Sequence, residues 1–201
     1  MSPSSEARTG RRVRGRIALA LGAAALLGAS VGQAATLGGV EVEDTLQAGG
    51  TSLQLNGAGL RSRFFIKLYV AGLYTEQGEG SARAILLADA PMAITLDIVS
   101  DRVTRDKMIE ALNDGFATST GGDIAPVAEG MAQLESAMGD TMSAGSSMTF
   151  AYEPGVGTRV LRDGTEAALI EGLDFKQALF GIWLSDSPVD GKLKGGLLDQ
   201  G

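Results

Sequence analysis

The chain has 201 residues with 17 basic and 24 acidic side chains, a net charge of −7, and neither cysteine nor histidine. The lack of cysteine and histidine excludes disulfides, cysteine nucleophiles, zinc ribbons and Ser-His-Asp triads. An acidic chain repels phosphate backbones, so we expect no nucleic-acid partner. Its carboxylates do not have the spacing of a calcium-binding loop, and we expect neither a metal nor any other cofactor.

The N-terminal segment has the pattern of a secretory signal peptide. A basic stretch over residues 11–16 precedes an apolar run over residues 17–27, and small residues follow as far as Ala34. The apolar run is shorter than the roughly 18–20 residues that span a bilayer, which favours cleavage after Ala34 or Ala35 over an uncleaved anchor. The Arg11-Arg12 pair leaves both the general and the twin-arginine export route open.

Cleavage would leave one acidic domain. Residues 1–34 carry five Arg and one Glu, so the remainder has a net charge of −11. We expect a signal peptide over residues 1–34 and a single domain over residues 35–201, long enough to bury a core without disulfides. We also expect a periplasmic location, with membrane contact only through the signal peptide before cleavage.

The first half of the domain is dominated by strand patterns. Thr51 to Leu55 predicts a strand, and Asn56-Gly57 after it is a turn signal. Phe64 to Tyr74 is rich in aromatic and branched residues and predicts a second strand. Ser81 to Ala88 predicts a short helix capped by Ser81. Met92 to Val99 predicts another strand.

Helices, strands and helices follow in that order. Thr104 to Thr118 has a helical apolar stripe that Thr104 can cap, and residues 127–138 have a second stripe. Residues 146–152 predict a strand, and residues 158–170 predict a hairpin around Asp163-Gly164. An apolar helix is expected over residues 175–184, and Ser187-Pro188 has the pattern of a helix start. This order of elements predicts an α+β domain with helices on one face of an antiparallel sheet.

Three segments carry a family resemblance. They are Leu55–Arg61 with Ile66–Tyr74, Tyr152–Thr158, and Phe175–Leu184 with Ser187-Pro188-Val189. In this order they resemble the chalcone isomerase family, and most closely its secreted bacterial branch. The resemblance implies an open-faced β-sandwich, in which a curved antiparallel sheet is backed by a layer of helices and a ligand cleft lies between them.

The resemblance also implies site residues. Plant enzymes of the family use an arginine to guide the substrate oxyanion, and this position matches Arg61. Their threonine, tyrosine and asparagine, which help to polarise a carbonyl, fall on Tyr69, Thr104 and Ala111. The anion receptor is therefore kept and most of the carbonyl-polarising set is lost. In another branch of the family an arginine and a tyrosine hold the carboxylate of a fatty acid, and Arg61 with Tyr69 is similar to that pair.

We therefore expect Arg61, Tyr69 and Thr104 to bind a small amphipathic anion without catalysis. One alternative is a lyase or isomerase that holds an enone oxyanion at Arg61 and uses Tyr69 as proton donor. Another is an accessory envelope protein in which Arg61 only pairs with a carboxylate. On one straight strand Arg61 and Tyr69 would lie roughly 26 Å apart, at about 3.3 Å per residue. A shared site requires the chain to fold back between Arg63 and Ile66, where no Gly, Asn or Pro marks a turn.

Overall fold

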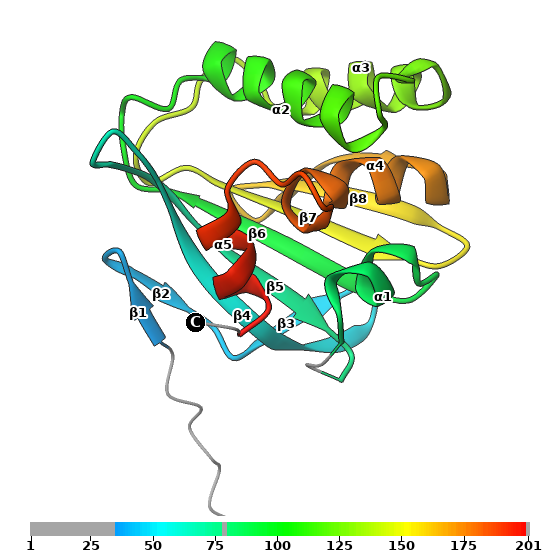
Figure 1. Ribbon diagram of the computed structural model, residues 1–201, viewed down its shortest axis with the longest axis horizontal. Coiled ribbons are helices and arrows are strands. Elements are labelled where there is room, and N and C mark those ends of the chain that lie inside the picture. The colour runs from blue at the N-terminus through cyan, green and yellow to red at the C-terminus, as the bar shows by residue number, and fades with distance from the viewer. Residues whose placement is uncertain (1–34, 78–79, 200–201) are drawn as a thin grey trace, which may run out of the picture. The chain divides into compact units, whose positions relative to one another are not determined.

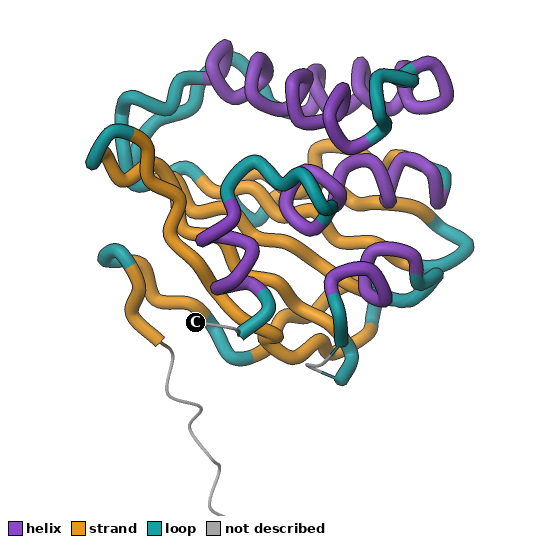
Figure 2. The backbone as a smooth tube through the Cα atoms, in the orientation of Figure 1, coloured by secondary structure: helices purple, strands orange, loops and turns teal. Residues whose placement is uncertain are grey.

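A strongly curled antiparallel sheet of seven strands forms the centre of the described chain, residues 35–77 and 80–199 of the computed structural model (Figures 1 and 2). Its order, β3-β4-β5-β6-β7-β8-β9, follows the chain, so each strand pairs with its sequence neighbours. The strands are β3 (Thr45–Ala48), β4 (Thr51–Arg63), β5 (Ile66–Thr75), β6 (Met92–Ile98), β7 (Ser147–Glu153), β8 (Gly157–Arg162) and β9 (Thr165–Ile170). The predicted signal peptide lies outside the described residues.

The helices lie on one face of this sheet (Figure 1). They are α1 (Ala82–Leu87), α2 (Arg105–Ser119), a 3-10 turn η1 (Ala125–Val127), α3 (Ala128–Ala137), α4 (Leu173–Leu184) and α5 (Gly191–Leu197). A separate hairpin of β1 (Ala35–Leu37) and β2 (Val40–Val42) packs against the other face. In the described ranges no helix is both long enough and apolar enough to cross a bilayer. The expected α+β class and the curved sheet backed by helices are confirmed.

The alternation of β5 divides its side chains between two apolar clusters. Tyr69, Ala71 and Leu73 point to the helix face and join the larger cluster, whereas Val70 and Tyr74 point to the β1–β2 hairpin. Successive strand residues face opposite sides of a sheet, which accounts for this division. The candidate site lies on the helix face, where the first residues of β5 and residues of α2 line the same pocket.

Several local signals are confirmed. The Ser81 hydroxyl accepts a hydrogen bond from the Ala84 amide at 3.2 Å and caps α1. The Thr104 hydroxyl accepts one from the Lys107 amide at 3.5 Å and caps α2. Asp163 and Gly164 form the turn between β8 and β9 with positive φ angles of 49° and 76°. These features depend on residues within one turn of each other, which is why sequence patterns identify them.

The predicted turn at Asn56-Gly57 is wrong. Asn56-Gly57 is no turn, because β4 continues through it with a bulge between Leu55 and Gly57. The Asn56 side-chain amide instead donates to the Leu197 carbonyl at 2.8 Å. The missing side chain of Gly57 lets the backbone of α5 approach the strand, since a Cβ there would lie 2.8 Å from the Leu197 carbonyl oxygen.

The final helix also starts later than its predicted Ser-Pro signal. Its first residue is Gly191, and its N-cap is Asp190 rather than Ser187. The Asp190 carboxylate accepts hydrogen bonds from the amides of Lys192 and Leu193, at 2.9 and 3.1 Å. A carboxylate at the N-cap accepts hydrogen bonds from the free amides of the first helical turn, and its negative charge interacts favourably with the positive end of the helix dipole.

Candidate ligand-binding site

A two-residue turn at the end of β4 brings Arg61 and Tyr69 together. Strand β4 ends at Arg63 and β5 begins at Ile66, so the intervening Phe64 and Phe65 form a hairpin turn. The predicted start of the second strand at Phe64 is therefore wrong by two residues. Their φ angles are +49° and +65°, the signs that a type I′ turn requires. Arg61 and Tyr69 are consequently direct cross-strand partners. The fold-back on which a shared site depends is present.

Two side chains donate hydrogen bonds to the Tyr69 hydroxyl. The Trp183 indole N–H donates to it at 3.0 Å, and the Arg61 guanidinium donates at 3.4 Å. The guanidinium carbon also lies 5.6 Å from the centre of the Tyr69 ring. Because the oxygen accepts both bonds, its own proton stays available, and it has no acceptor among the residues that the structure describes. The hydroxyl can therefore donate to a ligand.

Burial sets the protonation state of this phenol. Tyr69 is 3% exposed, and its desolvation raises the pKa above the ordinary tyrosine value. The positive charge of Arg61 and the hydrogen bonds from Trp183 and Arg61 act in the opposite direction but do not cancel the effect of burial. The hydroxyl is thus protonated at neutral pH and acts as a hydrogen-bond donor rather than as a base.

Arg61 is held in place without a counter-charge. The ion pairs within the described ranges are made by Arg105 and Arg159, and none of them involves Arg61. An ion pair of Arg61 with a carboxylate would favour the accessory-protein alternative, and the described residues form no such pair. A guanidinium has five N–H donors in a planar fork, so most of its capacity remains for a carboxylate or phenolate ligand.

A pocket of ≈ 420 Å³ lies beside this pair and is lined by residues of the β4–β5 hairpin and of α2. This volume is within the range of roughly 300–1,000 Å³ that small-molecule sites occupy. Its apolar lining comes from Ile66, Leu68, Val103, Met108 and Ala111. Its charged lining comes from Arg61, Arg63, Arg102 and Lys107 against Glu110 and Asp114, an excess of two positive charges. The pocket combines apolar walls with a positive potential, as an amphipathic anion requires.

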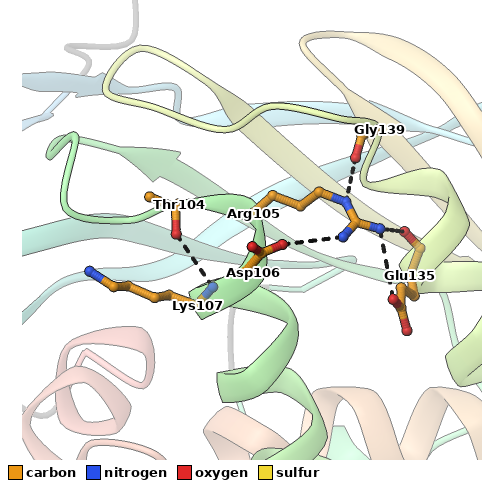
Figure 3. A network of polar contacts seen from close by, with 6 residues as sticks. All are labelled: Thr104, Arg105, Asp106, Lys107, Glu135 and Gly139. Atoms are coloured by element: carbon orange, nitrogen blue, oxygen red, sulfur yellow. Dashed lines mark hydrogen bonds and ion pairs between the residues drawn. The ribbon is translucent and has the colours of Figure 1, made fainter.

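Helix α2 is fixed in position as one wall of the pocket by contacts at its N-terminus (Figure 3). The Arg105 Nε donates to the Gly139 carbonyl at 2.6 Å, and its guanidinium pairs with Glu135 at 3.7 Å. Thr104 is exposed, is occupied as the helix cap and is not part of the pocket lining. The structure therefore brings Arg61 and Tyr69 together but places Thr104 at the helix start, and a ligand role for these residues stays a prediction.

No sequence pattern indicates the buried polar contacts of Trp183 and Lys176. Trp183 lies in the predicted apolar helix over residues 175–184 and is buried, but its indole N–H also orients the Tyr69 hydroxyl from 114 positions further along the chain. Lys176 is fully buried, and its ammonium donates to the carbonyls of Ile85, Leu86 and Ala88 at 3.1, 2.8 and 2.8 Å. Burial lowers the pKa of Lys176 to about 8. Its three N–H groups are all used at the end of α1, so this lysine is structural.

No set of His, Cys, Asp or Glu side chains within the described ranges is placed to hold a metal ion. The family model described as "Chalcone isomerase-like" matches residues 34–199. Among solved structures, the chain is similar to the fatty-acid binding protein AtFAP1 of Arabidopsis thaliana, with 17% sequence identity and a TM-score of 0.63. The match covers 80% of this chain and 92% of that protein. No curated protein sequence matches.

Proposed function

Because the chain belongs to the chalcone isomerase-like family, we propose that it binds a small amphipathic anion, such as a fatty acid, in the pocket beside Arg61. The observation that carries the proposal is the Arg61 guanidinium, which contacts the Tyr69 hydroxyl at the pocket wall and has no carboxylate partner among the described residues. The likeness to a fatty-acid binding protein supports the same class of ligand, although at this identity it establishes the fold alone.

The chemistry of the pocket suits a carboxylate with an apolar tail. Arg61 can donate two charge-assisted hydrogen bonds to the carboxylate, and the free proton of Tyr69 can provide a third. The tail would then lie against the apolar wall of Leu68, Val103 and Met108. Each buried CH2 group contributes about 0.8 kcal/mol, so the tail supplies most of the affinity and Arg61 selects the anion.

Binding without catalysis is favoured over the lyase alternative. Ala111, at the position that the resemblance assigns to the asparagine of the plant enzymes, lines the pocket but has no polar side-chain atom. Thr104, at the tyrosine position, is engaged in capping α2. An enone ring-closure assay distinguishes the two functions: turnover above background that disappears in Tyr69→Phe would contradict binding alone.

Titration with a fluorescent long-chain fatty acid tests the proposal. Arg61→Ala removes the charged donors, and hydrogen bonds to charged groups contribute about 1.5–3 kcal/mol, so we expect affinity to fall roughly 10- to 100-fold. Arg83→Ala, an exposed arginine on α1, is the matched control and should bind as the wild type does. Equal affinity of Arg61→Ala and wild type would overturn the proposal.

We further propose that the protein is exported to the periplasm, on the basis of the basic and apolar segments over residues 11–27. The mass of the protein recovered from periplasmic extract checks this directly. We expect a mature chain that begins at Ala35 or Thr36. Recovery of the uncleaved chain from the cytoplasm would contradict the export.

A further inference from the structure

The tip of the β4–β5 hairpin presents two bare aromatic side chains. Phe64 is 80% exposed and Phe65 is 106% exposed, and within the described residues no other large hydrophobic side chain exceeds 51%. Both have positive φ angles, a conformation that is strained for bulky residues and that Asn-Gly would adopt readily. The pair therefore costs folding stability and buries almost no surface in return, which indicates a role outside the fold.

Basic side chains surround this tip. Arg63 lies beside Phe64, with its guanidinium carbon 5.4 Å from the ring centre. Lys67 is exposed on the same hairpin, and Arg102 and Lys107 line the pocket together with Phe64. The acidic groups of the pocket lining are Glu110 and Asp114 on α2, and the carboxylate of Asp101, next to Arg102 in the sequence, accepts a hydrogen bond from the Ala144 amide at 3.1 Å.

The local excess of positive charge contrasts with the rest of the molecule. The whole chain has a net charge of −7, so an anionic surface repels most of the protein and attracts the hairpin end. Aromatic side chains flanked by Lys and Arg are typical of segments that enter the boundary between lipid headgroups and acyl chains. The local positive charge and the exposed aromatic side chains thus both favour an anionic lipid surface as the partner, with the hairpin tip directed toward it.

We propose that the β4–β5 hairpin docks on the surface of an anionic phospholipid bilayer, with Phe64 and Phe65 inserted at the headgroup boundary. The basic residues around the tip contact the lipid phosphates. In this orientation the pocket faces the membrane, because Arg63 and Phe64 contribute both to the tip and to the pocket lining. The inference goes beyond the proposed function and does not depend on it, since it concerns the turn rather than the Arg61–Tyr69 pair. It also differs from the sequence-based expectation that the mature domain makes no membrane contact.

Vesicle flotation tests the docking with two kinds of vesicle, one of phosphatidylcholine alone and one of phosphatidylcholine and phosphatidylglycerol in equal amounts. We expect the wild-type domain to bind the phosphatidylglycerol vesicles and to be released as ionic strength rises from about 0.1 to about 1 M, where the Debye length falls from about 10 to about 3 Å. Phe65→Gly should weaken this binding about tenfold. It should not lower the melting temperature, because glycine adopts the positive φ of this position without strain. Lys67→Glu should weaken binding at least fivefold.

Matched controls and the ligand assay separate the possible outcomes. Leu87→Ala and Arg83→Glu change an exposed apolar and an exposed basic residue on α1, and both should bind vesicles as the wild type does. Phe65→Gly should keep its affinity for a fluorescent fatty acid in the absence of vesicles, so failure of docking and failure of ligand binding are distinguishable. Wild-type protein that does not float, or Phe65→Gly that floats equally, would overturn the proposal. So would a dimer in solution that Phe65→Gly dissociates, since the tip would then be a contact between two copies.

Discussion

Lys176→Met tests how the fold holds a buried charge. The Lys176 ammonium is inaccessible to solvent and donates to three carbonyls at the end of α1, and methionine has a similar length but no donor. Each carbonyl left unsatisfied costs about 1–3 kcal/mol, partly offset because the desolvated charge is also removed. We expect the free energy of unfolding at pH 7 to fall by about 3 kcal/mol in urea titrations followed by circular dichroism. Lys192→Met, an exposed lysine on α5, should leave it unchanged.

The pH dependence of this difference provides the sharper test. Burial lowers the pKa of Lys176 from 10.5 to about 8, and the Asp89 carboxylate opposes this only in part. Between these values the unfolded chain binds more protons than the native protein, so wild-type stability rises with pH, by up to about 1.4 kcal/mol per pH unit. The pKa of both Tyr74 and Tyr152 is raised to about 12, so they reduce stability only above about pH 10.

Lys176→Met lacks this titration, so the gap in unfolding free energy between wild type and variant should widen from pH 8 to pH 9.5. A gap that stays constant or narrows over this interval would refute the reasoning. Such a result would mean that the hydrogen bonds to the three carbonyls stabilise the charged ammonium at least as much as desolvation destabilises it.

Two further predictions concern the scaffold and the site. Gly57→Ala places a methyl group against the carbonyls of Gly196 and Leu197 and should lower the free energy of unfolding by at least about 2 kcal/mol. In the control Gly195→Ala the new methyl group meets no neighbouring element within 4 Å, so the free energy of unfolding should rise by up to about 1 kcal/mol. Equal shifts of the two variants in thermal melts would contradict the close approach of α5 to β4. Tyr69→Phe leaves the Trp183 indole N–H without its partner and should cost about 1–3 kcal/mol of stability. Because Trp183 is the single tryptophan, its fluorescence should change in the same variant, and an unchanged spectrum would contradict the contact.

The sequence predicts the fold well where the signals are local. The caps at Ser81 and Thr104 and the Asp163-Gly164 turn are short-range features, and the structure has all three. The strand and helix order also follows from residue patterns, apart from β1, β2 and β3, which are short and lie in the glycine-rich region before Thr51. The α+β class could therefore be inferred without any tertiary information.

The misassigned elements are those in which tertiary contacts override local preference. Asn56-Gly57 has the composition of a turn, but α5 packs on Gly57 and the strand continues. Phe64 and Phe65 have strand propensity, yet they form the turn itself, against the preference of bulky residues for negative φ. Because the sequence predicts a strand over this pair, it does not indicate that both aromatic side chains lie exposed at the tip of the hairpin.

The candidate site could be predicted only in part for the same reason. Arg61 and Tyr69 were identified through the family resemblance, whereas their contact depends on a turn without any turn residue. Trp183 reaches Tyr69 from a helix far along the chain, and Lys176 is satisfied by the end of another helix. Such long-range polar contacts leave no periodic or spacing signal in a single sequence.

The central claim is that the pocket selects an amphipathic anion through Arg61. Calorimetric titration with a long-chain fatty acid and with its methyl ester tests this most directly, because the two ligands share the tail and differ in the charged oxygen pair. The charge-assisted bonds of Arg61 and the donor of Tyr69 predict that the acid binds at least about tenfold more tightly than the ester. Equal or tighter binding of the ester would contradict the claim and reduce the site to an apolar cavity.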